Sequence, residues 1–232
     1  MYAGGLVLLA ALVSSSWSDT VDRYERHHQS RAEFFAQSVF SILSTQELVL
    51  DVVGRELLRR GEFPEVPYAL PLLDSVLASN PSIAGIGLVR PDGQFIALSS
   101  NVNLEQLPNL RGSETTAPSF DLTLTEDKLI LGRTYYFEPL EKWIIPVRKA
   151  LRDESGEVVM VVTAGLEIEC DRGIFRKDHH SRDADSLMLF RERDGYLQYL
   201  DREGVGPADY AAIRRTEEQA REEVVRLEKQ TG

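Results

Sequence analysis

The sequence predicts an α+β fold, in which a long N-terminal helix precedes a five-stranded antiparallel sheet and a partial second module follows. Two observations predict this fold. Residues 18–61 contain no proline and repeat apolar residues at helical spacing. Residues 82–169 contain short runs rich in β-branched and aromatic residues, separated by tight-turn clusters. Helices gathered ahead of consecutive strands favour the α+β class over an alternating α/β order.

The first segment, residues 1–17, carries no charge and ends at Trp17. Its apolar run is short for a membrane span, which takes about 20 residues. A terminal tryptophan suits a membrane interface. We expect a membrane anchor here, and two alternatives stay open: a cleaved signal peptide, although the usual basic start is absent, and a buried helix.

Two helices are expected next. The long stalk helix covers 18–61 and ends where Gly61 is followed by Pro64. A shorter helix covers about 70–79 and stops at the Asn80-Pro81 pair, because the residue before a proline disfavours helical backbone.

The five strands of the sheet follow. A hairpin over 82–100 turns at Pro91-Asp92-Gly93. Residues 101–127 are expected to be loop with a short helical stretch near 118–125. Three further strands cover about 128–137, 142–152 and 157–169, which completes a domain over 62–170.

The remaining part, residues 171–232, predicts a partial second module or a C-terminal appendage. Two short β-rich runs within 186–200 flank the turn signal Asp194-Gly195. A charged helix is expected over 208–230, where Glu and Arg recur at helical spacing.

Composition excludes several function classes. The formal net charge of −11 argues against nucleic-acid binding, because an acidic surface repels phosphates. Cys170 is the single cysteine, so no internal disulfide forms. The four histidines occur as two adjacent pairs, a spacing that does not suit a metal site on a helix. No catalytic motif or cofactor motif is present, so we expect no enzyme activity, no metal and no cofactor.

Residues 131–169, LGRTYYFEPLEKWIIPVRKALRDESGEVVMVVTAGLEIE, resemble the core of Cache domains. These are PAS-like extracytoplasmic sensors of bacterial membrane receptors, and the resemblance is greatest to those that precede GGDEF diguanylate cyclases. It implies a small-molecule pocket between the sheet and its covering loops. It also implies a place in the bacterial inner membrane, with the sensor domain facing the periplasm and an output domain coupled through the N-terminal helix. The amine-binding Cache subgroup carries an Asp where this sequence has Gly165, so the resemblance disfavours an amino-acid ligand held in the usual way.

Seven strand residues are candidates for the ligand site. Aromatic side chains could form a pocket wall, arginines could bind a carboxylate or phosphate, and a strand glycine leaves room for a ligand. The candidates are Arg133, Tyr135, Tyr136, Trp143, Arg148, Thr163 and Gly165. The alternative for the aromatic residues is ordinary core, and for the arginines it is solvent or a surface ion pair.

Two functions therefore stay open at the level of the sequence. The first is a ligand-sensing module of a membrane receptor. The second is a non-sensing domain that dimerises or binds a partner protein through the long helix. The charged start of that helix, Asp19–Arg31, leaves a narrow apolar seam, so we expect a weak homodimer in either case.

Overall fold

The structure is a computed structural model that describes residues 2–60, 69–103, 107–168, 187–191, 193–201, 210 and 212–216. The chain divides into two compact units, Met1–Ile42 and Leu43–Gly232. The described part of the first unit is helical throughout. The second unit holds the sheet and the candidate site.

A single helix, α1 (Tyr2–Arg60), crosses from the first unit into the second. It confirms the predicted long helix and begins earlier, since it includes residues 2–17. Within the described residues, no helix has the combination of length and apolarity that a membrane crossing needs. The membrane anchor expected at residues 1–17 stays a prediction. At its end Arg59 and Arg60 both pair with Glu56, at 2.9 Å, and cations suit the carbonyl end of a helix.

The main sheet is antiparallel, with strand order β2-β1-β6-β5-β3 and with β4 also paired to β5. The strands are β1 (Ile83–Val89), β2 (Phe95–Leu98), β3 (Ile130–Leu131), β4 (Tyr135–Phe137), β5 (Lys142–Arg152) and β6 (Val158–Glu167). The hairpin β1–β2 and the run from β4 to β6 confirm the predicted antiparallel sheet. The last strand, β6, lies in the middle of the sheet, between β1 and β5.

The predicted third strand, 128–137, is wrong as a single element, because it consists of β3 and β4 with a break between them. Gly132 still donates its N–H to the Pro146 carbonyl at 2.7 Å. The chain then leaves the ladder at Arg133 and Thr134, whose side chains contact residues of the C-terminal hairpin. The sheet therefore has six strands rather than five.

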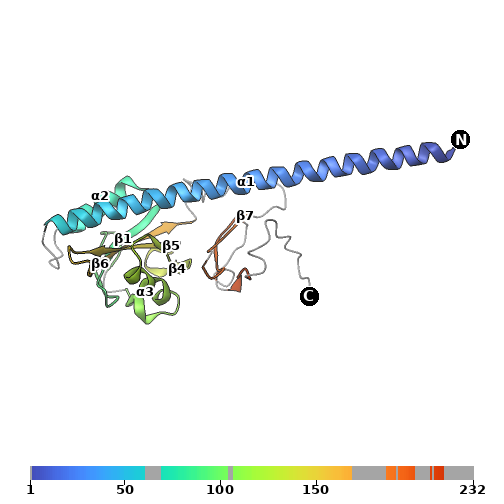
Figure 1. The fold of residues 1–232 in the computed structure, drawn as a ribbon. Helices are drawn as coiled ribbons and strands as arrows, with labels where there is room; N and C mark the ends of the chain where they lie inside the picture. The colour runs from blue at the N-terminus through green and yellow to red at the C-terminus, as the bar shows by residue number, and fades with distance from the viewer. Residues whose placement is uncertain are drawn as a thin grey trace. The chain divides into compact units, whose positions relative to one another are not determined.

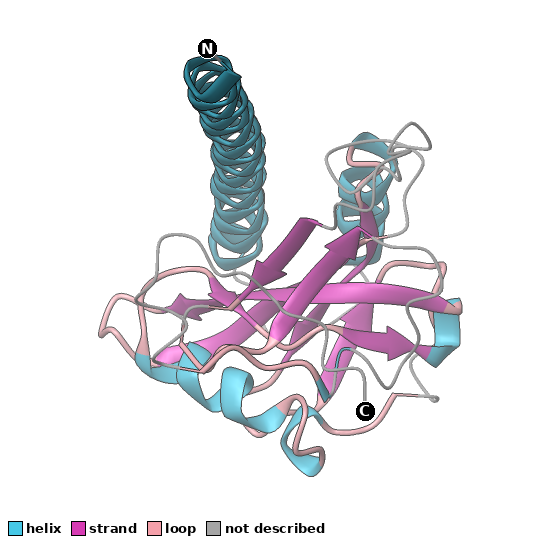
Figure 2. Ribbon diagram, turned by 90° about the vertical axis from the view of Figure 1, so that its right-hand side faces the viewer, coloured by secondary structure: helices cyan, strands magenta, loops and turns pink. Residues whose placement is uncertain are grey.

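Helices cover the two faces of the sheet differently (Figures 1 and 2). The part of α1 from Leu43 onward and α2 (Ala69–Ser79) lie on one face, and α3 (Ala117–Thr125) lies on the other. We call these the helix face and the loop face. On the helix face Leu50 and Val53 of α1 are fully or nearly fully buried, at 0% and 2% exposure.

The loop face has its own apolar core. Val89, Leu110, Phe120 and Val161 pack together there, and Phe120 is fully buried. The short helix η3 (Leu110–Gly112) belongs to the segment that covers this face. A second short helix, η4 (Glu138–Leu140), joins β4 to β5, in the gap between two of the predicted strands.

The C-terminal hairpin is confirmed. It consists of β7 (Leu187–Phe190) and β8 (Leu197–Asp201), and Gly195 takes a left-handed φ of 71° in its turn. The helix predicted over 208–230 lies mostly outside the described residues. Within it, 213–216 are not helical, because Arg214 forms a β-bridge with Tyr196.

Candidate ligand-binding site

A row of residues with little or no side chain crosses the loop face of the sheet. Gly85 of β1 pairs with Gly165 of β6, and Gly165 pairs with Pro146 of β5. Gly132 continues the row through its hydrogen bond to Pro146. Because direct cross-strand partners project on the same side, three glycines and one proline form a low floor. We call this row the glycine floor.

The next row of the same face carries two polar side chains. Gly87 pairs with Thr163, Thr163 pairs with Arg148, and Arg148 pairs with Ile130. The Thr163 hydroxyl and the Arg148 guanidinium therefore project beside the glycine floor, since direct partners stand about 4.5–5.5 Å apart.

A cavity of about 40 Å³ lies on the glycine floor. Its walls are mostly apolar, and Tyr135 and Thr163 supply the side-chain hydroxyls among its lining residues. Lining residues from the covering segments include Val102, Leu107, Phe137 and Leu140. This volume takes only a few water molecules.

A larger hollow of about 490 Å³ adjoins this cavity. Phe95, Leu107, Tyr135 and Phe137 line both spaces, so the two are neighbours. The outer hollow also reaches Thr115, Thr116 and the exposed Glu138. Its volume falls in the range of small-molecule sites, about 300–1,000 Å³.

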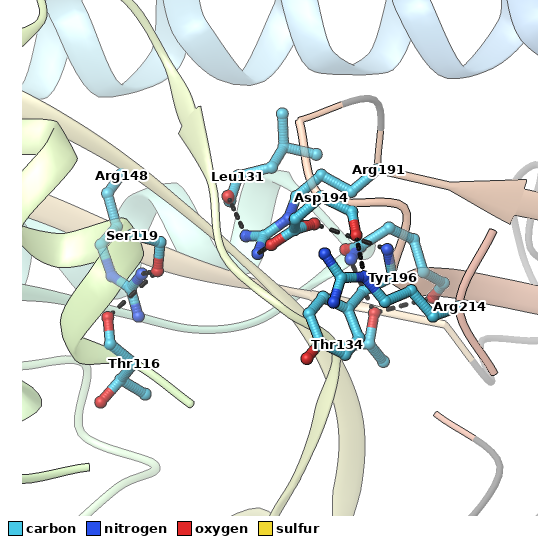
Figure 3. A network of polar contacts seen from close by, with 10 residues as sticks. Thr116, Ser119, Leu131, Thr134, Arg148, Arg191, Asp194, Tyr196 and Arg214 are labelled. Carbon is cyan, nitrogen blue, oxygen red and sulfur yellow. Dashed lines mark hydrogen bonds and ion pairs between the residues drawn. The ribbon is translucent and has the colours of Figure 1, made fainter. Parts of the chain in front are cut away.

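Arg148 is a buried charge, with 1% of its surface exposed. It lines neither space and stands beside the cavity as the cross-strand partner of Thr163, which lines the inner one. Its Nη1 donates to Ser119 Oγ at 2.6 Å, and its Nε has no hydrogen-bond acceptor among the described residues. Ser119 Oγ in turn donates to the Thr116 carbonyl (Figure 3). Burial lowers the pKa of Arg148 to about 10, and the positive charge of Arg191 acts in the same direction. At neutral pH the guanidinium is therefore charged and lacks a carboxylate partner within the described residues.

Tyr135 lies between the two spaces. Burial raises the pKa of its hydroxyl, and the positive charge of Arg148 opposes this rise. The hydroxyl is therefore protonated at neutral pH and can donate a hydrogen bond to a bound molecule.

Trp143 and Tyr136 belong to the opposite face of the sheet. They are direct cross-strand partners with ring centroids 5.5 Å apart, and Trp143 also packs 4.8 Å from Tyr210. Strand alternation puts Trp143 on the same side as Lys149, away from Arg148. Tyr136 borders the outer hollow, and Trp143 lines neither space.

Arg133 belongs to the contact between the main sheet and the C-terminal hairpin. Its guanidinium carbon lies 3.6 Å from the centre of the Tyr196 ring. Thr134 Oγ1 donates to the Gln198 carbonyl at 2.8 Å, and Arg191 Nη1 donates to the Leu131 carbonyl at 3.0 Å, while Arg191 also pairs with Asp194 (Figure 3). These contacts fix the hairpin on the connection between β3 and β4.

Of the seven candidates, Tyr135, Thr163 and Gly165 line the inner cavity, and Arg148 stands next to Thr163 on the same loop face. Sequence reasoning missed Gly85, Gly132, Pro146 and Ser119. A signal for Gly85 was present, because IAGIGLV places two glycines two apart in a strand, where they share a face. No group of three or more His, Cys, Asp and Glu residues that could hold a metal occurs in the described ranges.

No family model matches the sequence. No curated protein matches it either. Several solved structures share its fold. The ligand-binding domain of the Pseudomonas fluorescens chemoreceptor CtaA in complex with L-alanine has a TM-score of 0.59 at 16% identity, over 84% of this chain and 76% of that chain.

Two further structures match with similar TM-scores, identities and coverage. The ligand-binding domain of the Campylobacter jejuni chemoreceptor Tlp3 in complex with L-valine has a TM-score of 0.54 at 11% identity, over 74% of this chain and 68% of that chain. The ligand-binding domain of the Pseudomonas aeruginosa amino acid chemoreceptor PctC in complex with GABA has a TM-score of 0.55 at 14% identity, over 75% of this chain and 74% of that chain. The chain therefore has the fold of the Cache-type, PAS-like sensor domains.

Proposed function

We propose that this chain is the small-molecule sensing module of a bacterial membrane receptor and that its ligand binds above the glycine floor. The observation that supports this proposal most is the floor itself. Three glycines and a proline on adjacent strands leave an apolar cavity beneath a covering segment, with hydroxyls at its edge. Apolar sites with a few placed polar groups are typical of small-molecule binding.

The contacts of α1 support a role in signalling. Lys149 of β5 donates to Glu47 of α1 at 2.7 Å and lies 3.3 Å from Asp51. The Leu129 N–H also donates to Glu47, at 3.1 Å. A ligand that displaces β5 on the loop face would thus displace the residues that hold α1, and α1 would carry the displacement toward an output region.

The fold likeness to chemoreceptor domains supports an extracytoplasmic site, facing the periplasm from the inner membrane. The sequence resemblance to domains that precede GGDEF diguanylate cyclases makes such an enzyme one candidate output. A chemotaxis signalling domain is the other candidate. In both cases the sensing module itself performs no chemistry.

A pocket-filling variant tests the proposal. A Cβ at Gly85 would meet Val102 and Leu140 at 3.4 and 3.5 Å, which is ordinary contact, so Gly85→Ala fills the cavity without a clash. The matched control is Gly112→Ala, whose Cβ meets nothing within 4 Å. A thermal-shift screen with small carboxylates, amines and nucleobases should give at least one stabilising compound. Gly85→Ala should weaken its binding about tenfold and Gly112→Ala should not.

The outcome that contradicts the sensing function is a screen without a stabilising compound, or one whose compounds bind Gly85→Ala as well as the original chain. That result would favour the second function, a dimerisation or partner-binding domain. Exposed aromatic residues on α1 give this alternative its support, since Phe34 and Phe40 are 72% and 73% exposed. We propose a weak homodimer through this helix, which sedimentation equilibrium with and without the compound would measure.

A further inference from the structure

We propose that the ligand is a small carboxylate without an ammonium group, and that the buried guanidinium of Arg148 binds its anionic end. This inference rests on the proposed function, because it names the class of molecule that occupies the same site. The small cavity on the glycine floor would take one end of the ligand's apolar part, and the outer hollow would hold the rest.

The first argument is the unsatisfied charge of Arg148. Among the described residues its one hydrogen bond goes to Ser119, a neutral hydroxyl. A buried charge is costly unless it is paired with an opposite charge and hydrogen-bonded. A guanidinium presents five donors in a planar fork that matches a carboxylate. Nε, which has no acceptor, and the Nη groups are therefore suited to an anion that arrives with the ligand.

The second argument is the position of Arg148. It is the direct cross-strand partner of Thr163 and stands two residues from Pro146 on the same face of β5. Both neighbours line the cavity on the glycine floor. Gly132 lets the guanidinium pack closely against the connection between β3 and β4, since a Cβ there would lie 2.9 Å from Arg148 Nη1. An anion at the β5 edge of the cavity would thus meet Arg148, with the Tyr135 and Thr163 hydroxyls as further donors.

The third argument concerns the sign of the charge around the site. The described residues that line the inner cavity include no Asp and no Glu. Glu138 lines only the outer hollow and is exposed to solvent. An ammonium group in the inner cavity would find no counter-charge there and would lie beside the positive charge of Arg148. The site therefore favours a carboxylate and disfavours its amino-acid counterpart.

Arg152 provides a matched control on the same strand and the same face. It is partly buried, and its guanidinium donates to two backbone carbonyls, those of Gly156 and Leu124, each at 3.0 Å. Arg148→Met should raise the melting temperature of the ligand-free chain by about 2–4 °C, because it removes a buried charge that has no carboxylate partner in the described part of the chain. Arg152→Met should lower it, because it removes two satisfied hydrogen bonds.

Binding is measured with three molecules that share a four-carbon chain: butyrate, butyramide and 2-aminobutyrate. Butyrate should stabilise the original chain, and its two counterparts should bind at least tenfold more weakly. Arg148→Met should weaken butyrate binding by about 10–100-fold, the effect of losing hydrogen bonds to a charged group. Arg152→Met should leave butyrate binding unchanged.

Three results would overturn the inference. Equal binding of butyramide would remove the need for an anion, and tighter binding of 2-aminobutyrate would show that an ammonium group is accommodated. If butyrate gives no shift and Arg148→Met lowers the melting temperature as Arg152→Met does, Arg148 has only a structural role. The sensing function itself survives each of these results if any compound binds in a way that Gly85→Ala weakens.

Discussion

Arg148 and Lys149 are consecutive residues of β5 whose side chains leave opposite faces of the sheet. Arg148 Nη1 donates to Ser119 on the loop face, at 2.6 Å, and Lys149 Nζ donates to Glu47 of α1 on the helix face, at 2.7 Å. One peptide bond therefore separates the buried charge beside the candidate site from the ion pair that holds α1. A displacement of the β5 backbone at Arg148 would therefore also displace the backbone that carries Lys149.

The ion pair between Lys149 and α1 should contribute to stability. We expect Lys149→Met to lower the free energy of unfolding by about 1–2 kcal/mol, because it leaves Glu47 and Asp51 without their shared cation. Urea unfolding measures this change. Lys142→Met is the control, since Lys142 pairs with Glu167 at the same distance, 2.7 Å, but is 42% exposed. An equal loss in both variants would contradict a special role for the α1 contact.

The same ion pair should respond to acid. The hydrogen bond from Lys149 lowers the pKa of Glu47 below its ordinary value of 4.5. A carboxyl group whose pKa is depressed by folding stabilises the folded state above its unfolded pKa, and that contribution is lost as the pH falls through the folded value. Unfolding at a series of pH values below about 4.5 should show this loss, and Glu47→Gln should have a smaller slope. Identical slopes would show that Glu47 is not linked to folding.

Lys149 should set the alkaline limit of this contact. Burial alone would lower the pKa of Lys149, but its bonds to Glu47 and Asp51 raise it above 10.5. A cation whose pKa is raised by folding stabilises the folded state below its unfolded pKa and loses the contribution as the pH rises through the folded value. The contribution should therefore persist through neutral pH and disappear only above about pH 10.5. A loss between pH 7 and 9 in the original chain that is absent from Lys149→Met would contradict the assignment.

Close packing of α1 on the sheet depends on Gly54. A Cβ at this position would overlap Leu151 Cδ2, at the end of that side chain. Leu151 is 5% exposed and has little room to move aside, so Gly54→Ala should destabilise the fold by about 1–3 kcal/mol, despite the better helix propensity of alanine. Adding Leu151→Ala opens the space that the new methyl group needs. A double-mutant cycle by urea unfolding should thus give a favourable coupling of at least 1 kcal/mol, and simple additivity would show that the two residues do not touch.

The sequence was sufficient for elements with strong local signals. Strand β5 has the predicted bounds because a continuous β-rich run ends at a defined turn, in which Asp153 accepts the backbone N–H groups of Ser155 and Glu157 and Gly156 takes a φ of 85°. The long helix was predictable because its apolar residues recur at helical spacing over many turns.

The candidate site depends on pairings that local signals do not contain. The glycine floor exists because β6, the last strand of the sheet, inserts between β1 and β5 and so brings Gly165 beside Gly85. These two residues are far apart in the sequence, and a shift of one residue in register would turn one of them to the other face. The Nε of Arg148, which has no acceptor among the described residues, likewise follows from the tertiary arrangement around α3. Residue type alone predicted Trp143 as a pocket residue, although strand alternation puts it on the helix face.

Trp143 should therefore matter for stability and not for binding. Its ring packs on Tyr136 and Tyr210 and is 8% exposed, on the face opposite the glycine floor. Trp143→Phe should lower the free energy of unfolding by about 1–2 kcal/mol, since a smaller ring leaves part of the space unfilled. Isothermal titration at a temperature where both chains are folded should give the same affinity for any compound found in the screen. Gly85→Ala should show the reverse pattern, with little change in stability and weaker binding. If Trp143→Phe reduced affinity as Gly85→Ala does, the ligand would contact the helix face, and the assignment of the site to the loop face would be wrong.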